Sequence, residues 1–389
     1  MLAVGCGACG SSNGSPIHTV NASPLDAGYG APLLDAACGN TETDPLNCGG
    51  CGIQCGGGLC VDGVCSAPLP GVLASGQVTP KGIVIDDANV YWIDQGMQQS
   101  SGAYTSAQVM KCAKSGCANA PTVLASGSWN HTTRLALSGG TLYWAAPNLV
   151  LACPTTGGGA TVLSTSPLAP TDIAVDETGI YVGDSMQDAL LMFPLAGGMG
   201  PTVLWTSSAA PLAIALDGAT AYFATTGVSL ASCGATGTGC ASLVVGGTPT
   251  AVDVVGSVVY VGTQAQQSPG AIASCPEAHC AAALTILTTG LSYCAGIAVD
   301  STNVYFTDLG MTGADGGTTG VDGGTDFSGL GHVEKCPISG CSSNPTPVAA
   351  FVNLPQQIAV DDTSVYWTDF GSSTNPTGTQ DGRVMWAPK

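Results

Sequence analysis

One short pattern, present in seven copies, limits what this chain can fold into more than any other feature of its sequence. In "QQIAVDDTSVYWTDFG" (356–371), an apolar run, a four-residue turn and a second run with a Tyr follow one another. Clear copies lie at 81–96, 171–186 and 295–310, and eroded copies at 133–148, 212–227 and 251–264. Each copy has its Tyr five residues after the first apolar run: Tyr91, Tyr143, Tyr181, Tyr222, Tyr260, Tyr305 and Tyr366. Such self-similarity indicates small units that bury their faces against one another.

The residues between the copies predict two further strands for each unit. A third short strand follows each Tyr segment, as in "AQVMKC" and "GHVEKC", and a fourth follows in most copies, as in "PTVLASG" (121–127). The last copy stops after three strands at Lys389, while "PGVLASG" (70–76) matches the fourth strand and precedes the first copy. We therefore predict an all-β, seven-bladed β-propeller of four-stranded blades, in which residues 71–75 complete the blade formed by residues 357–387. That pairing closes the ring and removes its open edges.

The turn between the first two strands carries a recurring acid. An Asp at this position accepts hydrogen bonds from the following backbone amides and closes a hairpin, so we expect a structural and not a catalytic role. Ser138 and Val255 replace it in two copies. The other five copies have Asp86, Asp176, Asp217, Asp300 and Asp361.

These copies resemble the YWTD repeat, also called the low-density-lipoprotein-receptor class B repeat. The resemblance covers residues 70–389 and is closest at Tyr366-Trp367-Thr368-Asp369 and at residues 305–308. It implies a propeller and, because known members are mostly binding modules, a binding function. The motif itself is structural, so no catalytic residue carries over. This chain departs from the family in having seven copies instead of the usual six and in losing the Thr-Asp pair in the copies at 133, 212 and 251.

Composition restricts the partners and the compartment of the protein. Acids outnumber bases 26 to 7, so no basic patch is available for nucleic acid. No apolar stretch reaches the ~18 residues of a transmembrane helix. The 18 cysteines indicate an oxidising compartment, so we expect an extracytoplasmic protein, either secreted or on the outer cell surface.

We predict three segments along the chain. Residues 1–37 form a largely disordered leader and polar tether, 38–65 a Cys-rich module and 66–389 the propeller. The stretch Leu2-Ala3-Val4-Gly5-Cys6 resembles the end of a bacterial lipoprotein signal, in which the Cys is acylated. A lipid anchor at Cys6 is therefore one hypothesis, and an unstructured leader with incidental thiols is the other.

The cysteines fall into two groups. Three disulfides are expected in the 38–65 module, with open pairing, although a zinc knuckle at Cys48 and Cys51 is the alternative. Its six cysteines are Cys38, Cys48, Cys51, Cys55, Cys60 and Cys65. In the blades, four pairs bracket the turn between strands three and four, which predicts a disulfide in each: Cys112/Cys117, Cys233/Cys240, Cys275/Cys280 and Cys336/Cys341. Cys153 lacks a partner and Cys294 lies outside the pattern, so we expect two separate thiols.

Long loops between strands two and three predict a binding surface. They cover residues 95–107, 309–331 and 370–382 of blades 1, 6 and 7, which are neighbours in a closed ring, so we expect one continuous lip. The hypothetical ligand-binding residues are Asp94, Asp308 and Asp369 at the loop roots, with Trp129, His131 and Arg134 in the nearby segment "SGSWNHTTR". In the alternative interpretation, Trp129 packs between blades and His131 is solvated.

No cofactor is expected, although calcium is chemically possible. Asp315, Asp322 and Asp326 of the loop 313–329 could supply carboxylate ligands. The spacing of an EF-hand is absent, and a flexible Gly-rich loop is the alternative interpretation.

Two classes of function remain. The favoured hypothesis is a non-catalytic binding or adhesion protein that recognises an extracellular protein or carbohydrate on the loop-rich face over blades 6, 7 and 1. The alternative is a propeller hydrolase, lactonase or lyase with a metal-assisted site near the axial channel. Only four His residues and no Gly-x-Ser-x-Gly or His-Glu-x-x-His motif occur, which favours binding.

Overall fold

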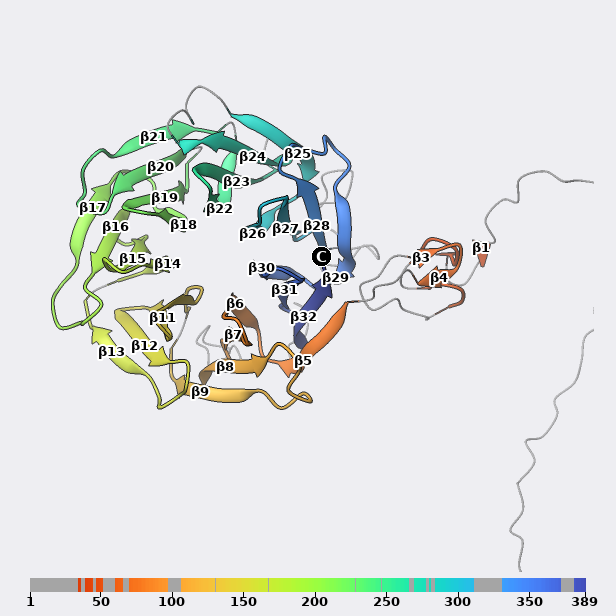
Figure 1. Ribbon diagram of the computed structural model, residues 1–389, viewed down its shortest axis with the longest axis horizontal. Coiled ribbons are helices and arrows are strands. Elements are labelled where there is room, and N and C mark those ends of the chain that lie inside the picture. The colour runs from red at the N-terminus through yellow and green to blue at the C-terminus, as the bar shows by residue number, and fades with distance from the viewer. Residues whose placement is uncertain are drawn as a thin grey trace, which may run out of the picture.

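The computed structural model shows an all-β protein whose strands are arranged in a ring of seven blades (Figure 1). The residues that the structure describes are 34–35, 39–44, 47–51, 60–65, 70–96, 106–129, 131–166, 168–227, 229–245, 247–265, 269–277, 280, 284–310, 331–371 and 381–389. This part of the chain contains no α-helix, and so none long and apolar enough to cross a membrane. The predicted fold class is confirmed.

Each blade is a four-stranded antiparallel sheet. In blades 1 to 6 the strands run in chain order from the centre of the ring outward, whereas the outermost strand of blade 7 comes from the start of the propeller sequence. Blade 1 contains β6 (Pro80–Ile85), β7 (Asn89–Asp94), β8 (Ala107–Ala113) and β9 (Thr122–Gly127). Blade 2 contains β10 (Ala136–Ser138), β11 (Thr141–Ala146), β12 (Leu149–Pro154) and β13 (Thr161–Ser164). Blade 3 contains β14 (Pro170–Val175), β15 (Ile180–Asp184), β16 (Ala189–Phe193) and β17 (Thr202–Thr206).

The remaining blades repeat this order. Blade 4 contains β18 (Pro211–Asp217), β19 (Thr220–Thr225), β20 (Ser229–Gly234) and β21 (Ala241–Val244). Blade 5 contains β22 (Thr248–Val255), β23 (Val258–Gln264), β24 (Gly270–Pro276) and β25 (Thr285–Leu291). Blade 6 contains β26 (Cys294–Val299), β27 (Asn303–Asp308), β28 (Gly331–Pro337) and β29 (Thr346–Val352). Blade 7 contains β30 (Pro355–Val360), β31 (Ser364–Asp369), β32 (Gly382–Pro388) and β5 (Gly71–Gln77).

The two ends of the propeller sequence meet in blade 7. Strand β5 pairs antiparallel with β32, with Gly71 opposite Trp386 and Gln77 opposite Gly382. The strand covers 71–77 and is thus two residues longer than predicted. Because the outer strand comes from the start of the ring and the inner three from its end, unfolding either terminus opens the circle.

The repeated aromatic residues fill the space between blades. Adjacent residues of a strand point to opposite faces, so the Tyr-Trp pair of a second strand serves two neighbours. Tyr91 packs in a core with Trp144 of blade 2, whereas Trp92 packs in a core with Tyr366 of blade 7. Both side chains are at most 1% exposed. The second strand of each blade is therefore buried on both faces.

The acid of the first turn closes the hairpin as predicted. In blade 1, the Asp86 carboxylate accepts hydrogen bonds from the amides of Ala88 and Asn89 at 2.8 and 2.7 Å. Its other oxygen accepts from the Tyr91 hydroxyl at 2.6 Å. The contact between this acid and the Tyr five residues later recurs in blades 6 and 7, where Asp300 and Asp361 accept from Tyr305 and Tyr366 at 3.1 and 3.2 Å. The constant spacing of Asp and Tyr thus has a direct structural cause.

The four disulfides predicted in the blades are present, with Cα–Cα distances between 4.0 and 5.6 Å. Each joins a cysteine near the end of a third strand to one in the turn that follows. The bonded pairs are Cys112 with Cys117, Cys233 with Cys240, Cys275 with Cys280, and Cys336 with Cys341. The pairing predicted from the spacing is therefore confirmed.

The position of the second cysteine in three of the four pairs corrects the prediction that the pair brackets the turn. Cys117, Cys280 and Cys341 lie well before the first residue of the fourth strand, so they are within the turn and not at its far end. Cys240 directly precedes β21, so the pair Cys233/Cys240 brackets its turn as predicted. The first cysteine of each pair is buried, whereas Cys117 and Cys341 are half-buried and Cys240 is exposed. Cys280 is buried like its partner. The physical reason is that the short loop of each disulfide keeps the second cysteine close to the third strand, before the chain turns back to pair.

The remaining described cysteines lie in the third strand of blade 2, in the first strand of blade 6 and in the Cys-rich module. Cys153 and Cys294 are buried free thiols. Short strands lie at Leu34–Asp35 (β1), just before the module, and within it at Gly39–Asn40 (β2), Cys60–Val61 (β3) and Val64–Cys65 (β4). There Cys48 is bonded to Cys60, and Cys51 is also disulfide-bonded. Cys6, Cys38 and Cys55 lie outside the described residues.

Candidate functional site

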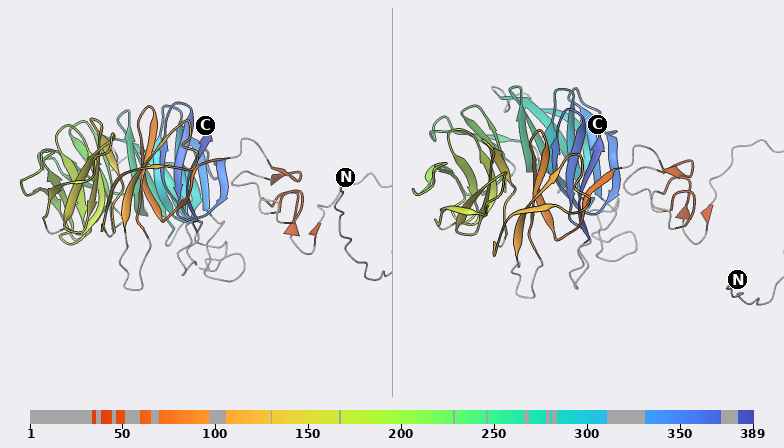
Figure 2. Two further views of the ribbon diagram at one scale, coloured as in Figure 1. Left: turned by 90° about the horizontal axis from the view of Figure 1, so that it is seen from below. Right: turned by 60° about the horizontal axis from the view of Figure 1, so that its bottom comes forward.

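The propeller has two faces with different connections (Figure 2). The turns between strands one and two, and between three and four, open on the face that carries Lys389, which we call the turn face. The connections between strands two and three open on the opposite, or loop, face. Most of the three predicted long loops, namely 97–105, 311–330 and 372–380, lies outside the described residues, as do Asp315, Asp322 and Asp326.

The three aspartates at the loop roots are buried and contact the chain that enters their blades. Asp94, Asp308 and Asp369 are 6%, 7% and 3% exposed. Asp94 accepts a hydrogen bond from the Val78 amide at 3.2 Å. Asp308 accepts from the amides of Ser292 and Tyr293 at 3.0 and 2.8 Å. A structural role in holding the inter-blade connections accounts for these contacts.

Burial changes the acidity of two of these groups. It raises the pKa of Asp94 to about 7, despite the hydrogen bond from Val78. It also raises the pKa of Asp369 to about 7, although the Asn353 backbone lowers it in part. One oxygen of each carboxylate is buried without a hydrogen-bond partner among the described residues. Burying the ionised carboxylates of Asp94 and Asp369 therefore destabilises the fold, and their hydrogen bonds offset this only in part.

The structure separates Trp129, His131 and Arg134. Trp129 is 7% exposed and packs edge-on against Trp144 with ring centroids 5.0 Å apart, so it lies in the core between blades 1 and 2. His131 is exposed. Arg134 faces the central opening, where its Nε lies 3.4 Å from the Asp172 carboxylate of blade 3. These residues therefore do not form one surface with the three aspartates.

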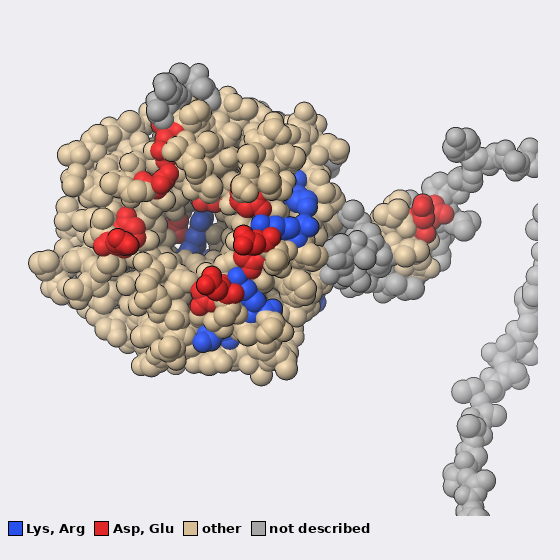
Figure 3. Space-filling view, in the orientation of Figure 1, with Lys and Arg blue, Asp and Glu red and all other residues tan. Residues whose placement is uncertain are grey.

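The central opening holds further buried charge. Burial raises the pKa of Asp253 to about 6, although hydrogen bonds from the amides of Val254 and Val299 and the Arg134 charge lower it in part. Burial also raises the pKa of Asp172, against the effect of Arg134. Blue atoms are visible inside the opening in Figure 3, which looks onto the turn face. Arg134 thus balances acids that come from the inner strands of two other blades.

A groove between blades 5 and 6 is the clearest hollow next to titratable side chains. It encloses about 480 Å³. Blade 5 contributes Leu291 and Ser292, while blade 6 contributes Asp308, His332 and Glu334. Asp308 lies opposite His332 in the pairing of β27 with β28, and Glu334 follows two residues later on the same face of β28. The three side chains therefore point toward blade 5 together.

In the groove, burial shifts the pKa values of Glu334 and His332 so that the neutral form of each is favoured. Burial, and secondly the nearby Asp308 carboxylate, raise the pKa of Glu334 to about 7. Burial lowers the pKa of His332, and the opposing effect of Asp308 does not compensate. The structure shows no hydrogen bond to the Glu334 carboxylate among the described residues. A half-buried carboxyl that titrates near neutrality and faces a hollow can bind a cationic group or exchange a proton.

Sequence reasoning missed Glu334, although a signal was present. Its position lies opposite the aromatic or apolar residue of the second strand in every blade. The other six blades have Met110, Leu151, Leu191, Ala231, Ala273 and Met385 there. A comparison of the third strands by register would have marked Glu334 as the single charged residue at an apolar position.

The described ranges offer no set of donors for a metal centre, since no group of three or more His, Cys, Asp or Glu side chains there could hold a metal ion. A second hollow of about 240 Å³, between residues 162–166 and 198–200, is lined by uncharged residues. The groove between blades 5 and 6 is therefore the candidate functional site.

Comparison with known proteins supports the fold and leaves the family open. No protein-family model matches the sequence. No curated protein matches it either. Virginiamycin B lyase from Staphylococcus aureus is 10% identical, with 81% of this chain and 97% of that chain covered and a TM-score of 0.60. The WD40 β-propeller domain of Doa1 is 8% identical, with 81% and 95% covered and a TM-score of 0.57. A nidogen/laminin complex matches over 51% of this chain and 76% of the other, with 18% identity and a TM-score of 0.42. The likeness to the lyase and to the WD40 domain shows, at these identities, the β-propeller fold alone.

Proposed function

We propose that the protein is an extracytoplasmic binding module that holds a cationic side chain of a partner protein in the groove between blades 5 and 6. The observation that carries this proposal is Glu334, a charged residue at a position that is apolar in the other six blades and that faces a hollow of about 480 Å³. Lys and Arg side chains present the matching charge, and Arg can also form a bidentate pair with a carboxylate. The apolar wall at Leu291 suits the aliphatic stem of such a side chain.

The disulfides support the extracytoplasmic location of the proposed binding module. Five described disulfides are typical of an extracellular or periplasmic protein. Membership of the YWTD class and acylation of Cys6 belong to the same proposal, since both fit a protein displayed outside the cell. The long loops of blades 6, 7 and 1 would then extend the contact surface beyond the groove, and Asp315, Asp322 and Asp326 would supply carboxylate ligands to calcium.

Peptide binding tests the proposal directly. The full chain is applied to 12-residue peptides that carry one Arg or Lys in a neutral sequence and to a panel of neutral oligosaccharides. We expect binding of the cationic peptides, weakened at least tenfold by Glu334→Gln and unaffected by Glu177→Gln, an exposed acid of the turn face. Equal binding by wild type and Glu334→Gln, or binding of oligosaccharides alone, would contradict a cationic ligand in the groove.

An acid–base enzyme is the second candidate. Glu334, whose pKa lies near 7, and the neighbouring His332 are the residue types that transfer protons in such enzymes. The full chain is incubated with ester and lactone substrates at pH 7. Turnover that Glu334→Gln reduces while KM stays unchanged would favour the enzyme over the binding module.

A further inference from the structure

The central opening of the ring is bordered by the first strands of the blades, which begin at the loop face and run toward the turn face. Two cations and two aromatic residues lie near the loop-face ends of these inner strands. Lys81 belongs to β6 in blade 1, and Arg134 lies just before β10 in blade 2. Tyr293 lies just before β26 in blade 6, and Phe370 just after β31 in blade 7. Blades 6, 7, 1 and 2 are consecutive, so the four residues come from one side of the opening.

Direct contacts connect these four residues. The Nζ of Lys81 lies 5.9 Å from the centre of the Phe370 ring. Phe370 and Tyr293 pack against one small apolar cluster of blades 6 and 7. Its buried members are Ala295, Leu309 and Leu354. A Cβ atom added to Gly82, the neighbour of Lys81, would lie 2.7 Å from the Cα of Arg134, so the first strand of blade 1 touches the start of blade 2 here.

The Arg134 guanidinium extends from blade 2 toward the axis of the ring. Its Nε lies 3.4 Å from the Asp172 carboxylate of blade 3. Burial raises the pKa of Asp253 in blade 5, and the Arg134 charge lowers it in part. Burial and the Arg134 charge oppose each other in the same way at Tyr293 and Cys294 of blade 6. A side chain of blade 2 that acts on blades 3, 5 and 6 must lie near the centre, and Lys or Arg atoms are visible within the opening in Figure 3.

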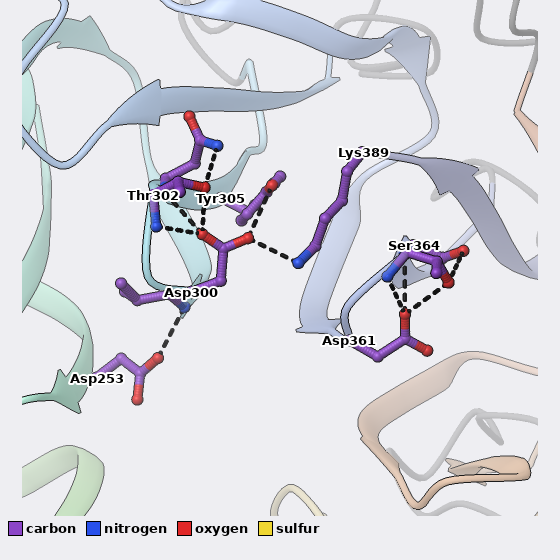
Figure 4. Close-up of polar contacts among 10 residues, drawn as sticks. Asp253, Asp300, Thr302, Tyr305, Asp361, Ser364 and Lys389 are labelled. Atoms are coloured by element: carbon purple, nitrogen blue, oxygen red, sulfur yellow. Dashed lines mark hydrogen bonds and ion pairs between the residues drawn. The ribbon is translucent and has the colours of Figure 1, made fainter.

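The two acids near Arg134 are held by backbone amides. Asp172 accepts a hydrogen bond from the Ile214 amide at 2.8 Å. Asp253 accepts from the amides of Val254 and Val299 at 2.9 and 3.0 Å, and the second of these bonds is drawn in Figure 4. These amides fix both carboxylates within the inner strands. Asp172 therefore holds the Nε edge of Arg134 and leaves the two terminal nitrogens of the guanidinium uncovered.

Both cations lack partners for most of their N–H donors. A guanidinium has five such donors, and those of Arg134 make one ion pair, through Nε, and no hydrogen bond within the described part of the chain. The Lys81 ammonium has neither a hydrogen bond nor an ion pair with any described residue. Burial lowers the pKa of Lys81, which shows that its charged form is disfavoured where it lies. An anion between the two side chains would offset this cost.

We propose that Arg134 and Lys81 bind the carboxylate of a small organic acid at the loop-face end of the central opening. The terminal nitrogens of Arg134 can form a bidentate pair with a carboxylate, and Lys81 adds a second positive charge. Phe370 and the adjoining apolar cluster offer surface to the hydrocarbon part of the acid, which an inorganic anion would not use. None of these residues lines the groove between blades 5 and 6, so this inference does not depend on the proposed function.

The test is isothermal titration calorimetry of the full chain with benzoate, acetate and inorganic phosphate at pH 7 and constant ionic strength. Benzoate should bind about tenfold more tightly than acetate, because its ring buries apolar surface. Lys81→Gln should weaken benzoate binding about threefold, since it removes one of two charges. Arg134→Gln is combined with Asp172→Asn, so that no buried carboxylate is left without its cation, and this pair should weaken binding about tenfold or more.

Two further variants keep the test decisive. Arg134→Lys retains the charge beside Asp172 and should fold, but it loses the planar fork, so it should still weaken benzoate binding about threefold. Arg383→Gln removes an exposed guanidinium of blade 7 and should leave binding unchanged. Absence of benzoate binding to wild type overturns the proposal, as does equal binding by wild type, Lys81→Gln and Arg134→Lys. Tighter binding of phosphate than of benzoate also overturns it, because the apolar surface would then play no part.

Discussion

Two aspartates that link blades on the turn face, Asp300 and Asp361, have pKa values shifted in the opposite direction to those of three acids on the loop face. On the turn face, partial burial alone would raise the pKa of Asp300 and of Asp361, but hydrogen bonds from Lys389 or Lys114 and from backbone amides outweigh it. Both pKa values therefore lie below the ordinary range. On the loop face, burial raises the pKa values of Asp94, Asp369 and Glu334 to about 7.

This difference shows how the molecule distributes structure and function. The turn-face acids accept hydrogen bonds with both oxygens and link neighbouring blades, so they stabilise the ring as anions. The loop-face acids Asp94 and Asp369 lie deeper, and each has one oxygen without a hydrogen-bond partner among the described residues. Their ionised forms therefore destabilise the folded state. Acids kept at a cost to stability are a common property of binding and catalytic sites. The contrast favours a function on the loop face.

The largest expected effect concerns Asp308, a loop-face acid whose two carboxylate oxygens both accept backbone hydrogen bonds. Asp308→Ala leaves the buried amides of Ser292 and Tyr293 without an acceptor, and we expect a loss of about 3 kcal/mol of unfolding free energy. Asp308→Asn keeps one oxygen and should cost about 1 kcal/mol. Urea denaturation measures both. Similar small losses in the two variants would show that these hydrogen bonds matter little.

The unfolding free energy should depend on pH through the acids of both faces. Because Asp300 and Asp361 have lowered folded pKa values, their contribution is present above the unfolded pKa of about 4 and is lost as pH falls further. Because Asp94, Asp369 and Glu334 have raised values, the unfolding free energy falls as pH rises from about 4 to 7. Urea denaturation from pH 2 to 8 should therefore give a maximum near pH 4 to 5. A steady increase up to pH 7 would refute the contrast between the faces.

A single contact between blades on the turn face should have a smaller effect. Lys114→Met removes the ammonium group from Asp361 but keeps the aliphatic stem, so we expect a loss of about 1 kcal/mol at pH 7 and low salt. Combining it with Asp361→Asn in a double-mutant cycle isolates the pair. A coupling energy near zero would mean that the turn-face charges contribute little to holding blades 1 and 7 together.

The smallest effect is expected from Glu334→Gln. This change removes a carboxyl whose charged form is disfavoured by burial, so the variant should be slightly more stable than wild type at pH 8 and equal to it at pH 5. The exposed Glu177→Gln should show no difference at either pH. A variant less stable than wild type at pH 8 would indicate that the Glu334 anion has a structural partner.

Residues that interact within one repeat were predictable, and residues that interact between repeats were not. The turn role of Asp86 followed from its distance of a few residues to the amides that it binds. For "SGSWNHTTR" the sequence left two interpretations open, and the structure confirms the one in which Trp129 packs between blades. The choice between them depended on Trp144 in the next blade, against which Trp129 packs. Arg134 was assigned to the loop surface, whereas its Nε lies 3.4 Å from the Asp172 carboxylate of the neighbouring blade.

The blade disulfides illustrate the same limit within a single turn. The spacing of Cys112 and Cys117 predicted their bond, because two cysteines so close in the chain can meet across a tight turn. It did not predict that the second cysteine lies inside the turn, since the start of the fourth strand depends on where that strand pairs with the third.

The sequence by itself determined the number of blades, the order of their strands and the closure of the ring by residues near 71–75, because these depend on a period and on a missing fourth strand. Only the tertiary structure decided which side chains of different blades meet. The groove around Glu334 joins residues of blades 5 and 6, and the ion pair of Lys114 with Asp361 joins blades 1 and 7. Such contacts arise from the geometry of packing one sheet against the next, which no local pattern of residues encodes.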